Sequence, residues 1–445
     1  MDDVAKLPLP PGSSGWPYLG ELPEFLKDGY GFVETRTQKY GPIFRTKILG
    51  RPAAVISGAD ASGLFVDQKL VQRSGAMPSH IQTLFGGRAL PVLDGDEHHE
   101  RKAFIMSAFT EEALAGYLPT LQTLVERSLA SWATGQEISW LAGFKRLAIE
   151  GICTTILGLP SGPVVDAVAR DYEIIVGGFT SLPVPLPGSA FSRAKAALAR
   201  VLAVYEKNVR ERLASPKTSA RDGLDHILAA RSARDGRQIS VDEAKMELHH
   251  IVVAGLIVWA WFVTSVRELE LHPDVRERLR AEVTALPRVL TLDALARAHE
   301  LQKVTMELRR LSPVVQVFFG QAREDFAFKG HRVPRGWMVL WGIRSSHLRA
   351  ETYTNPEAFD PERFSEARHE QTRHEHAFVP NGAGSPTRGH KCAGWEFAPM
   401  FLQTFVVELL RGGYAWTFTP GQDLSLDMSK VPPPPRGGLM AKLTR

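Results

Sequence analysis

The stretch FVPNGAGSPTRGHKCAG, residues 378–394, carries the most informative pattern in the sequence. Its glycines allow backbone amides to approach a bound group closely, and a predicted helix begins two to three residues after Cys392. Amide groups and a helix N-terminus both favour a thiolate over a thiol. His390 and Lys391 add hydrogen-bond donors and positive charge beside the sulfur. Cys392 is therefore a candidate anionic sulfur, either a nucleophile or a metal ligand, with a structural free cysteine on a loop as the alternative.

The composition narrows the class of protein. The chain has 445 residues, of which 44% are hydrophobic and 23% charged, and its two cysteines are Cys153 and Cys392. These values exclude a disordered chain, a collagen-like fibre and a small disulfide-stapled scaffold. The formal net charge of +4 is too small to indicate a nucleic-acid partner. So few cysteines predict a reducing compartment, and Cys153, inside an apolar helical segment, is predicted to fill the core.

The N-terminus lacks the positive and apolar segments of a signal peptide. The longest apolar run, residues 251–266, covers sixteen positions, whereas a bilayer span needs about 20. Charged helical sequence continues on both sides of this run. We therefore expect a buried core helix, no transmembrane anchor and a cytoplasmic location.

Helical spacing of apolar residues dominates from about residue 97 to 311. Strand-like patterns occur at residues 43–48 and 53–56, and again from 326 to 343. No repeat of 20 to 50 residues is present, and no linker separates the helical part from the strand-rich part. The sequence predicts a mostly α fold with a smaller β-rich lobe, in one domain over residues 1–445.

Two further motifs gain meaning in combination with the cysteine stretch. Glu307 and Arg310 share one face of a predicted helix, and alone they would form a solvated ion pair. FDPERF, residues 359–364, alone indicates a proline turn. The order Glu-x-x-Arg, then Asp-Pro-Glu-Arg-Phe, then a glycine-rich loop with Cys-x-Gly resembles the cytochrome P450 superfamily. The lead LPLPPGSSGWPYLGE (residues 7–21) and the segment FKGHRVPRGWMVLWGIRSSH (residues 328–347) are also similar to that family, so the resemblance covers nearly the whole chain.

The resemblance implies a cytochrome P450 fold with haem b between a long central helix and the cysteine stretch. It makes Cys392 the thiolate axial ligand of the haem iron, with Gly394 completing the Cys-x-Gly motif. It also implies a buried network that holds the loop before the cysteine, formed by Glu307, Arg310 and Arg363. The side chains that it places at the haem propionates are His98, Lys102 and His390.

The predicted central helix, residues 241–271, departs from the family pattern. Most relatives carry Ala-Gly-x-acid-Thr there, and the acid and the alcohol relay protons during oxygen activation. This chain has Ala254 and Gly255, but Ile257 and Val258 occupy the positions of the acid and the alcohol. Gly255 is expected to let a ligand approach the helix backbone. Thr264 lies nearly two turns beyond Val258, too far to substitute for the alcohol.

The cysteine stretch departs as well, because Ser385 stands seven residues before the cysteine, where most relatives carry phenylalanine. The run Gly-His-Lys-Cys at residues 389–392 resembles the loop of the fatty-acid peroxygenase branch, which uses hydrogen peroxide and lacks the acid–alcohol pair. That branch carries an Arg-Pro pair in the central helix, at positions that alignment on Glu247-Leu248 assigns to Val253 and Ala254. The allene oxide synthase branch, which isomerises a lipid hydroperoxide, also lacks the relay.

The resemblance implies a monooxygenase that inserts one oxygen atom into a hydrophobic substrate. Ferredoxin and its reductase, or a similar redox partner, would supply electrons in trans by docking on basic surface near Arg388 and Lys391. A peroxide-dependent peroxygenase or a hydroperoxide isomerase is the alternative, and a haem sensor or carrier is the alternative outside enzymes.

The predicted substrate pocket is lined by apolar residues, which favours a lipid-, terpenoid- or retinoid-like substrate. We expect a monomer without nucleic acid. The pocket candidates that follow the Glu-x-x-Arg helix are Val314, Val315, Val317 and Phe318.

Overall fold

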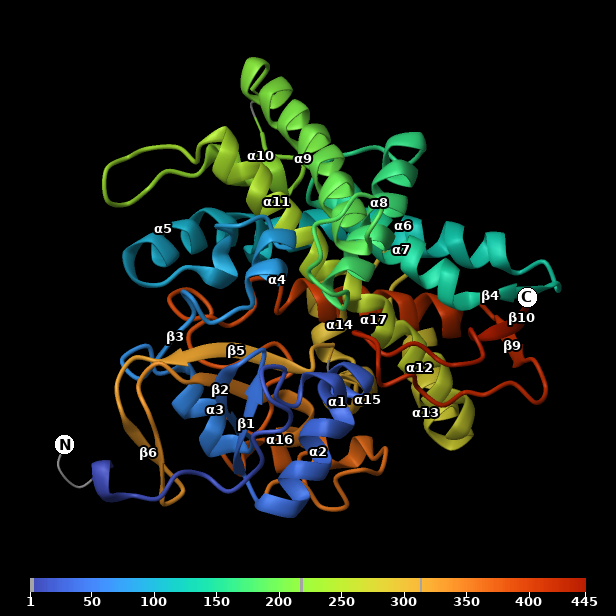
Figure 1. Ribbon diagram of the computed structural model, residues 1–445. Helices are drawn as coiled ribbons and strands as arrows, with labels where there is room; N and C mark the ends of the chain where they lie inside the picture. The colour runs from blue at the N-terminus through green and yellow to red at the C-terminus, as the bar shows by residue number, and fades with distance from the viewer. Residues whose placement is uncertain (1–3, 217–218, 313) are drawn as a thin grey trace.

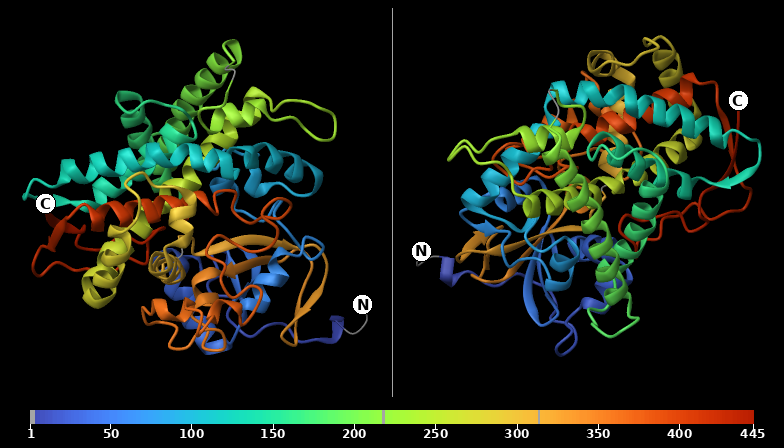
Figure 2. Two further views of the ribbon diagram at one scale, coloured as in Figure 1. Left: turned by 180° about the vertical axis from the view of Figure 1, so that it is seen from behind. Right: turned by 90° about the horizontal axis from the view of Figure 1, so that it is seen from above.

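The chain folds into a helical body and a smaller lobe built around a sheet (Figure 1). The computed structural model describes residues 4–216, 219–312 and 314–445. Seen from behind, the same two parts remain distinct, and the short helical turn Val4–Lys6 lies at the outer edge of the sheet lobe (Figure 2). The predicted mostly α fold with a smaller β-rich lobe is confirmed.

The sheet of the smaller lobe joins strands from the two ends of the chain. Its five strands, in spatial order, are β1 (Ile43–Ile48), β2 (Arg51–Ile56), β8 (Met338–Gly342), β5 (Val317–Ala322) and β3 (Val71–Gln72). β2 and β8 run parallel, with Ala54 opposite Val339, and the other pairs are antiparallel. The helices and short strands around this sheet are α1 (Leu22–Lys27), α2 (Gly29–Tyr40), α3 (Ala59–Val66), α16 (Ile343–His347), β6 (Phe326–Phe328) and β7 (His331–Val333).

The second strand of the β1–β2 hairpin begins earlier in the chain than the sequence suggested. Leu49 and Gly50 both have positive φ, 49° and 76°, which is the backbone of a tight two-residue hairpin turn. The second strand therefore starts at Arg51, two residues before the predicted start, with Pro52 paired opposite Lys47. Pro52 lacks an N–H, but the strand tolerates it near its first residue.

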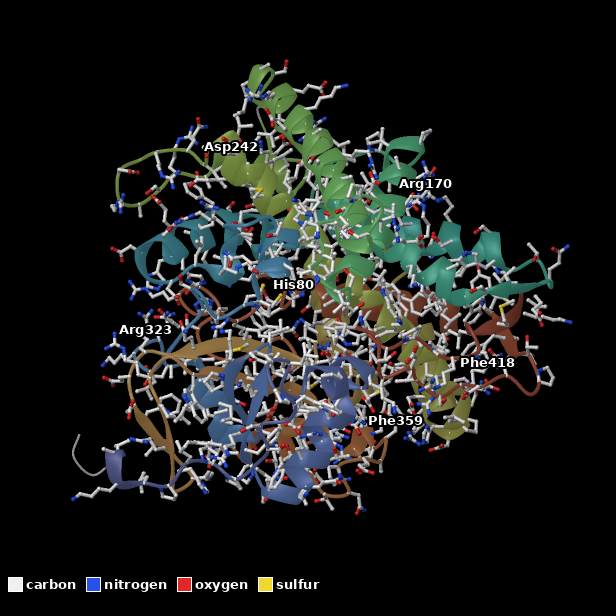
Figure 3. The ribbon with its side chains drawn as sticks, viewed as in Figure 1. His80, Arg170, Asp242, Arg323, Phe359 and Phe418 are labelled. Atoms are coloured by element: carbon white, nitrogen blue, oxygen red, sulfur yellow. The ribbon has the colours of Figure 1, made fainter. Side chains whose placement is uncertain are left out.

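The helical body contains the main hydrophobic core. Its helices are α4 (Ser79–Leu84), α5 (Gly95–Met106), α6 (Glu111–Trp132), α7 (Trp140–Thr155), α8 (Pro163–Phe179), α9 (Ala190–Ala214), α10 (Gly223–Ala229), α13 (Pro273–Thr284), α14 (Leu292–Arg297), α15 (His299–Leu311) and α17 (Phe397–Arg411). A three-stranded sheet, β4 (Glu137–Ser139), β10 (Met440–Thr444) and β9 (Ala415–Phe418), closes its far end. Side chains fill the space between these helices (Figure 3), and α17 packs against α6 within the main cluster.

The central helix crosses the body in two halves, α11 (Val241–Gly255) and α12 (Trp259–Leu271), joined by a 3₁₀ turn at Leu256–Val258. Ser240 and Glu243 form a capping box that starts α11. The run Val241–Leu271 is apolar and long enough to span a membrane, but 78% of its most apolar window is buried inside the protein. It is therefore a core helix, and the 3₁₀ turn falls where the sequence departs from the family pattern.

Candidate functional site

Cys392 lies at the end of its loop, where cations surround the sulfur. Its N–H donates to the carbonyl of Asn381 at 2.9 Å, which folds the stretch back on itself. The side chain keeps accessible surface, yet the protein around it is dense enough that burial raises the pKa of the thiol. Lys102, the amide of Gly394, Arg309 and Lys391 all act to lower that pKa. A thiol that coordinates a metal cation loses its proton outright, so metal binding would act in the same direction as these positive groups.

The basic residues predicted beside the cofactor converge on one place. The rings of His98 and His390 lie 4.0 Å apart, and Lys102 Nζ donates to the carbonyl of Lys391. Burial, with nearby cations, lowers the pKa of His98 to about 3, and burial lowers that of Lys102 to about 8. Arg73 completes the group, and burial lowers its pKa to about 9. The sequence reasoning missed Arg73, because nothing in its local pattern distinguishes it from a surface arginine.

Several polar atoms of this group lack a hydrogen-bond partner within the described part of the protein. They are both ring nitrogens of His98, one of which carries the proton of the neutral ring, Nη1 of Arg73, and Nε2 of His390, which lies 3.6 Å from Asp94 Oδ1. Buried polar atoms are nearly always paired, so unpaired donors gathered at one site indicate an anionic ligand. The two carboxylates of a haem, together with a thiolate for its iron, fit this donor set. The residues present therefore fit haem b.

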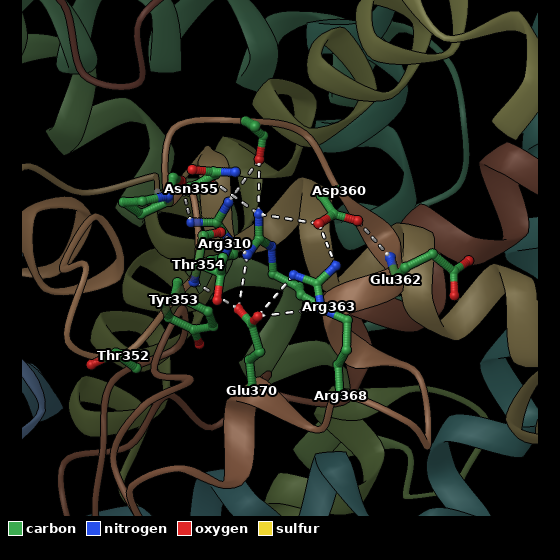
Figure 4. Close-up of polar contacts among 12 residues, drawn as sticks. Arg310, Thr352, Tyr353, Thr354, Asn355, Asp360, Glu362, Arg363, Arg368 and Glu370 are labelled. Atoms are coloured by element: carbon green, nitrogen blue, oxygen red, sulfur yellow. Dashed lines mark hydrogen bonds and ion pairs between the residues drawn. The ribbon is translucent and has the colours of Figure 1, made fainter.

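The Glu-x-x-Arg motif lies inside a buried network rather than on a solvated face. Glu307 accepts from Arg310 Nε at 2.7 Å and from Arg363 Nε at 3.0 Å, and all three side chains are fully buried. Arg310 also donates to the carbonyl of Pro356 at 2.6 Å. Figure 4 shows both guanidinium groups surrounded by the chain of residues 352–370. The ion pair is thus a structural clamp on the segment that precedes the cysteine loop.

His347 connects this clamp to the cysteine loop, a link that the sequence did not reveal. Its Nε2 accepts from the N–H of Val379 at 3.0 Å, and its Nδ1 lies 3.2 Å from the carbonyl of Arg310. Because Nε2 accepts, the ring proton sits on Nδ1 and is donated to that carbonyl. Burial, helped by the charge of Arg310, lowers the pKa of His347 to about 3. The neutral imidazole therefore joins α15 to the start of the loop.

Glu370 is a second residue of this buried network that the sequence did not reveal. It accepts from Arg363 Nη1 at 2.9 Å and from Arg368 Nη2 at 2.8 Å, and its side chain is 1% exposed. Burial acts to raise its pKa, but hydrogen bonds from Arg368, Thr354 and Arg363 outweigh burial and lower the pKa to about 2. It lies seven residues after Arg363 in an irregular loop, where no periodic pattern marks it.

We expect Glu370→Gln to destabilise the protein at neutral pH by about 3 kcal/mol, and the deficit to shrink in acid. The folded pKa lies below the ordinary value of 4.5, so the stabilisation is complete above pH 4.5 and is lost as pH falls toward 2. At pH 4 the gap between the two proteins should narrow by about 1 kcal/mol. Denaturant unfolding at pH 7, 5 and 4 measures this, with the exposed Glu366→Gln as control. An unchanged gap across this range contradicts the assignment.

The central helix packs one face against α7, and its opposite face is the candidate ligand-facing side. A Cβ on Gly255 would lie 2.7 Å from Cδ1 of Ile152 in α7, so this glycine serves helix–helix packing. Gly255 also keeps partial exposure, so its expected role in ligand approach stays a prediction. The period of 3.6 residues puts Met246, His250, Val253 and Ile257 on the opposite side. Met246, His250 and Ile257 keep partial exposure, although they lie deep in the chain's core helix.

The four positions predicted around the oxygen-activating turn are not equivalent. Ile257 is partly exposed on the ligand-facing side, and Ala254 is partly exposed beside it. Val258 is 3% exposed and packs in the main core. Thr264 donates its hydroxyl to the carbonyl of Ala260 at 2.9 Å, which agrees with the expectation that it does not replace the missing alcohol.

His250 is the polar member of the ligand-facing side. Its Nδ1 lies 3.0 Å from Glu247 Oε2, and its side chain is 13% exposed. Glu247 is fully buried and also accepts from Arg101 Nη1 at 3.0 Å and from the N–H of Leu90 at 2.9 Å. The carboxylate thus fixes the ring and leaves Nε2 for another partner. Sequence reasoning used Glu247 only as an alignment marker and did not select His250.

Two of the four pocket candidates after α15, Val317 and Phe318, lie on opposite sides of β5. Val317 is 6% exposed and packs under the sheet with Phe32 and Met338, so its predicted place in a substrate pocket is wrong. Phe318 points to the other side, toward the cysteine loop at Gly382. Successive residues of a strand face opposite sides, which accounts for this division. The remaining two candidates are Val314, buried in the main core, and Val315, partly exposed.

Comparison with known proteins gives consistent matches along the chain. The family model described as "Cytochrome P450" matches residues 10–439. The putative cytochrome P450 120 of Synechocystis is 32% identical, over 99% of this chain and 98% of that protein. Cytochrome P450 26B1 of Bos taurus is 32% identical, over 92% of this chain and 81% of that protein.

Solved structures agree with these matches. Retinoic-acid-bound cyanobacterial CYP120A1 superposes with a TM-score of 0.90 at 32% identity, covering 98% of this chain and 99% of that one. Cytochrome P450EX alpha (CYP152N1), solved with myristic acid, superposes with a TM-score of 0.80 at 23% identity, covering 99% of both chains. At that identity the second likeness shows the fold alone.

Proposed function

The chain belongs to the cytochrome P450 family, and from that premise we propose that it inserts one oxygen atom into an extended, retinoid-like hydrophobic substrate with electrons from a separate redox partner. The observation that carries the proposal is the likeness, along nearly the full length of both chains, to a protein solved with retinoic acid bound. Membership of the family makes the chain a haem-dependent oxidoreductase. We further propose that it acts in the cytoplasm.

Haem b is the cofactor of this family, and when bound it supplies the redox-active iron at which oxygen is activated. Cys392 would hold that iron through its thiolate. The two propionates would take the unpaired donors of His98, His390 and Arg73, with Lys102 beside them. The clamp of Glu307, Arg310 and Arg363, with His347, holds the loop that carries the sulfur.

An apolar ligand face supports a retinoid-like substrate. Met246, Val253 and Ile257 give hydrophobic contact along α11 and the following turn, and Phe318 lies near the cysteine loop. Mostly apolar lining with a small number of placed polar groups is typical of sites for drug-sized hydrophobic ligands. His250, oriented by Glu247, is the polar group that this side offers to an oxygen-bearing end of the substrate.

Retinoic acid is the first substrate to test, by titration of the haem-loaded protein followed by turnover. We expect a shift of the haem absorption on binding, and an oxygenated product when a ferredoxin, its reductase and NAD(P)H are supplied. A medium-chain polar acid of similar charge serves as the control ligand and should give no shift. If retinoic acid neither shifts the spectrum nor is oxidised, the retinoid-like substrate is excluded.

Peroxide-driven oxygenation is the second candidate, because neither Ile257 nor Val258 can donate a proton. A parallel reaction with hydrogen peroxide alone separates the two. Turnover that requires the electron-transfer proteins supports the monooxygenase. Equal or faster turnover with peroxide alone contradicts the need for a redox partner and establishes a peroxygenase.

A further inference from the structure

Arg309 connects the Glu-x-x-Arg helix to the cysteine by a route separate from the clamp. Its Nη2 donates to Oδ1 of Asn381 at 2.6 Å, and the carbonyl of Asn381 accepts the N–H of Cys392 at 2.9 Å. One asparagine therefore lies between the guanidinium of Arg309 and the backbone of the cysteine. The neighbouring Arg310 points instead into the clamp with Glu307.

The guanidinium of Arg309 is desolvated without a carboxylate partner. In the described ranges 4–216, 219–312 and 314–445, no acidic side chain lies within ion-pair distance of it, and its Nε has no hydrogen-bond partner. Its central carbon lies 5.5 Å from the ring centre of Trp261 and 5.3 Å from that of Phe378. Burial lowers its pKa to about 10, and the charge that opposes this effect belongs to Cys392.

A charge removed from water is costly unless an opposite charge compensates it. Arg310 and Arg363 are compensated by Glu307 and Glu370, whereas Arg309 faces the cysteine loop. Lys102 and Lys391 also act on Cys392, but both are cations and cannot compensate Arg309. In the described part of the chain, the Cys392 thiolate is the anionic group that remains to compensate the charge of Arg309.

We propose that Arg309 is the electrostatic partner of the Cys392 thiolate and a positioning residue that raises the reduction potential of the haem iron. This inference rests on the proposed role of Cys392 as the iron ligand. Reduction adds one negative charge to the iron–thiolate unit, so a fixed cation nearby favours the reduced form. Interior charges are poorly screened by water, which makes such an effect measurable.

The test compares Arg309→Gln, which removes the charge, with Arg309→Lys, which keeps it. The reduction potential of the haem-loaded protein is measured by spectroelectrochemical titration without substrate. We expect the glutamine variant to lower the reduction equilibrium constant about tenfold, which is about 59 mV for one electron. The lysine variant should stay within twofold of the parent. Arg297→Gln, an exposed arginine paired with Asp293 on α14, serves as the control and should not shift the potential.

Asn381→Ser supplies an independent variant, because it removes the hydrogen bond and leaves the charge. Its potential should also stay within twofold of the parent. An unshifted Arg309→Gln, equal shifts in the glutamine and lysine variants, or a tenfold shift in Asn381→Ser each overturns the proposal. The carbon-monoxide spectrum of every reduced variant is recorded in parallel. A thiolate band that persists in these variants shows that the ligand assignment still stands when the Arg309 inference fails.

Discussion

Cys392→Ala is expected to eliminate the absorption band of a reduced, carbon-monoxide-bound haem thiolate. Cys392 carries the single sulfur of the stretch 378–394, and the Gly394 amide and nearby cations favour an anion there. Alanine leaves those groups without their charge partner and leaves the iron without its ligand. We expect haem content to fall at least tenfold when the variant is purified and its pyridine haemochrome is measured. Any haem that remains should lack the thiolate spectrum.

The other cysteine provides a matched control for that experiment. Cys153 is fully buried in α7, and burial raises the pKa of its thiol to about 12, so it is an inert core group. Cys153→Ala should retain full haem content and an unchanged band, with a stability loss of about 1 kcal/mol from the small cavity. A thiolate band in Cys392→Ala, or its loss in Cys153→Ala, would show that the ligand has been assigned to the wrong residue.

Glu307→Gln is expected to have the largest effect on stability. The carboxylate accepts hydrogen bonds from two fully buried arginines and from the N–H of Asp360 at 2.9 Å. Glutamine keeps the shape but removes the charge, which leaves Arg310 without its carboxylate partner in the interior and takes one carboxylate from Arg363, which still pairs with Glu370. Breaking a buried pair by removing one partner costs about 3 to 5 kcal/mol. Denaturant unfolding of haem-free protein measures this cost without any contribution from cofactor binding.

An exposed pair of the same chemistry tests whether burial is the cause. Asp293 and Arg297 lie four residues apart on α14 at 2.9 Å, and both side chains are mostly exposed. Asp293→Asn should cost less than about 0.5 kcal/mol, because water screens that pair. Similar losses for Glu307→Gln and Asp293→Asn would contradict the account of the clamp as a desolvated network.

Local patterns in the sequence predicted the parts of the site that sit on regular elements or in short motifs. The resemblance to the cytochrome P450 superfamily, carried by the order of the motifs, singled out Cys392, Glu307 and Arg310. His347 and Glu370 could not be found this way, because their partners lie 32 and 7 residues away across irregular chain. Their function depends on how the chain of residues 343–379 folds back over α15.

The side of an element that faces the ligand was the other unpredictable quantity. The sequence placed Gly255 and Val258 at the site, and the structure shows in addition that Gly255 packs closely against Ile152 of α7 and that Val258 lies in the main core. Val317 was misplaced for a related reason, since both sides of β5 are hydrophobic and alternation gives no preference. A single sequence does not show which neighbouring element packs against a helix or strand, and that packing decides which side faces the ligand.

The parallel pairing of β2 with β8 has a consequence for biosynthesis. Ala54 in β2 pairs with Val339 in β8, which the ribosome adds 285 residues later. At 5 to 20 residues per second, the β1–β2 hairpin emerges roughly 15 to 60 s before its partner strand exists. During that interval a strand destined for the middle of a sheet has an open edge, which is a surface that recruits other nascent chains. Slower initiation at an unchanged elongation rate, which spaces ribosomes further apart, should therefore raise the soluble yield of this protein.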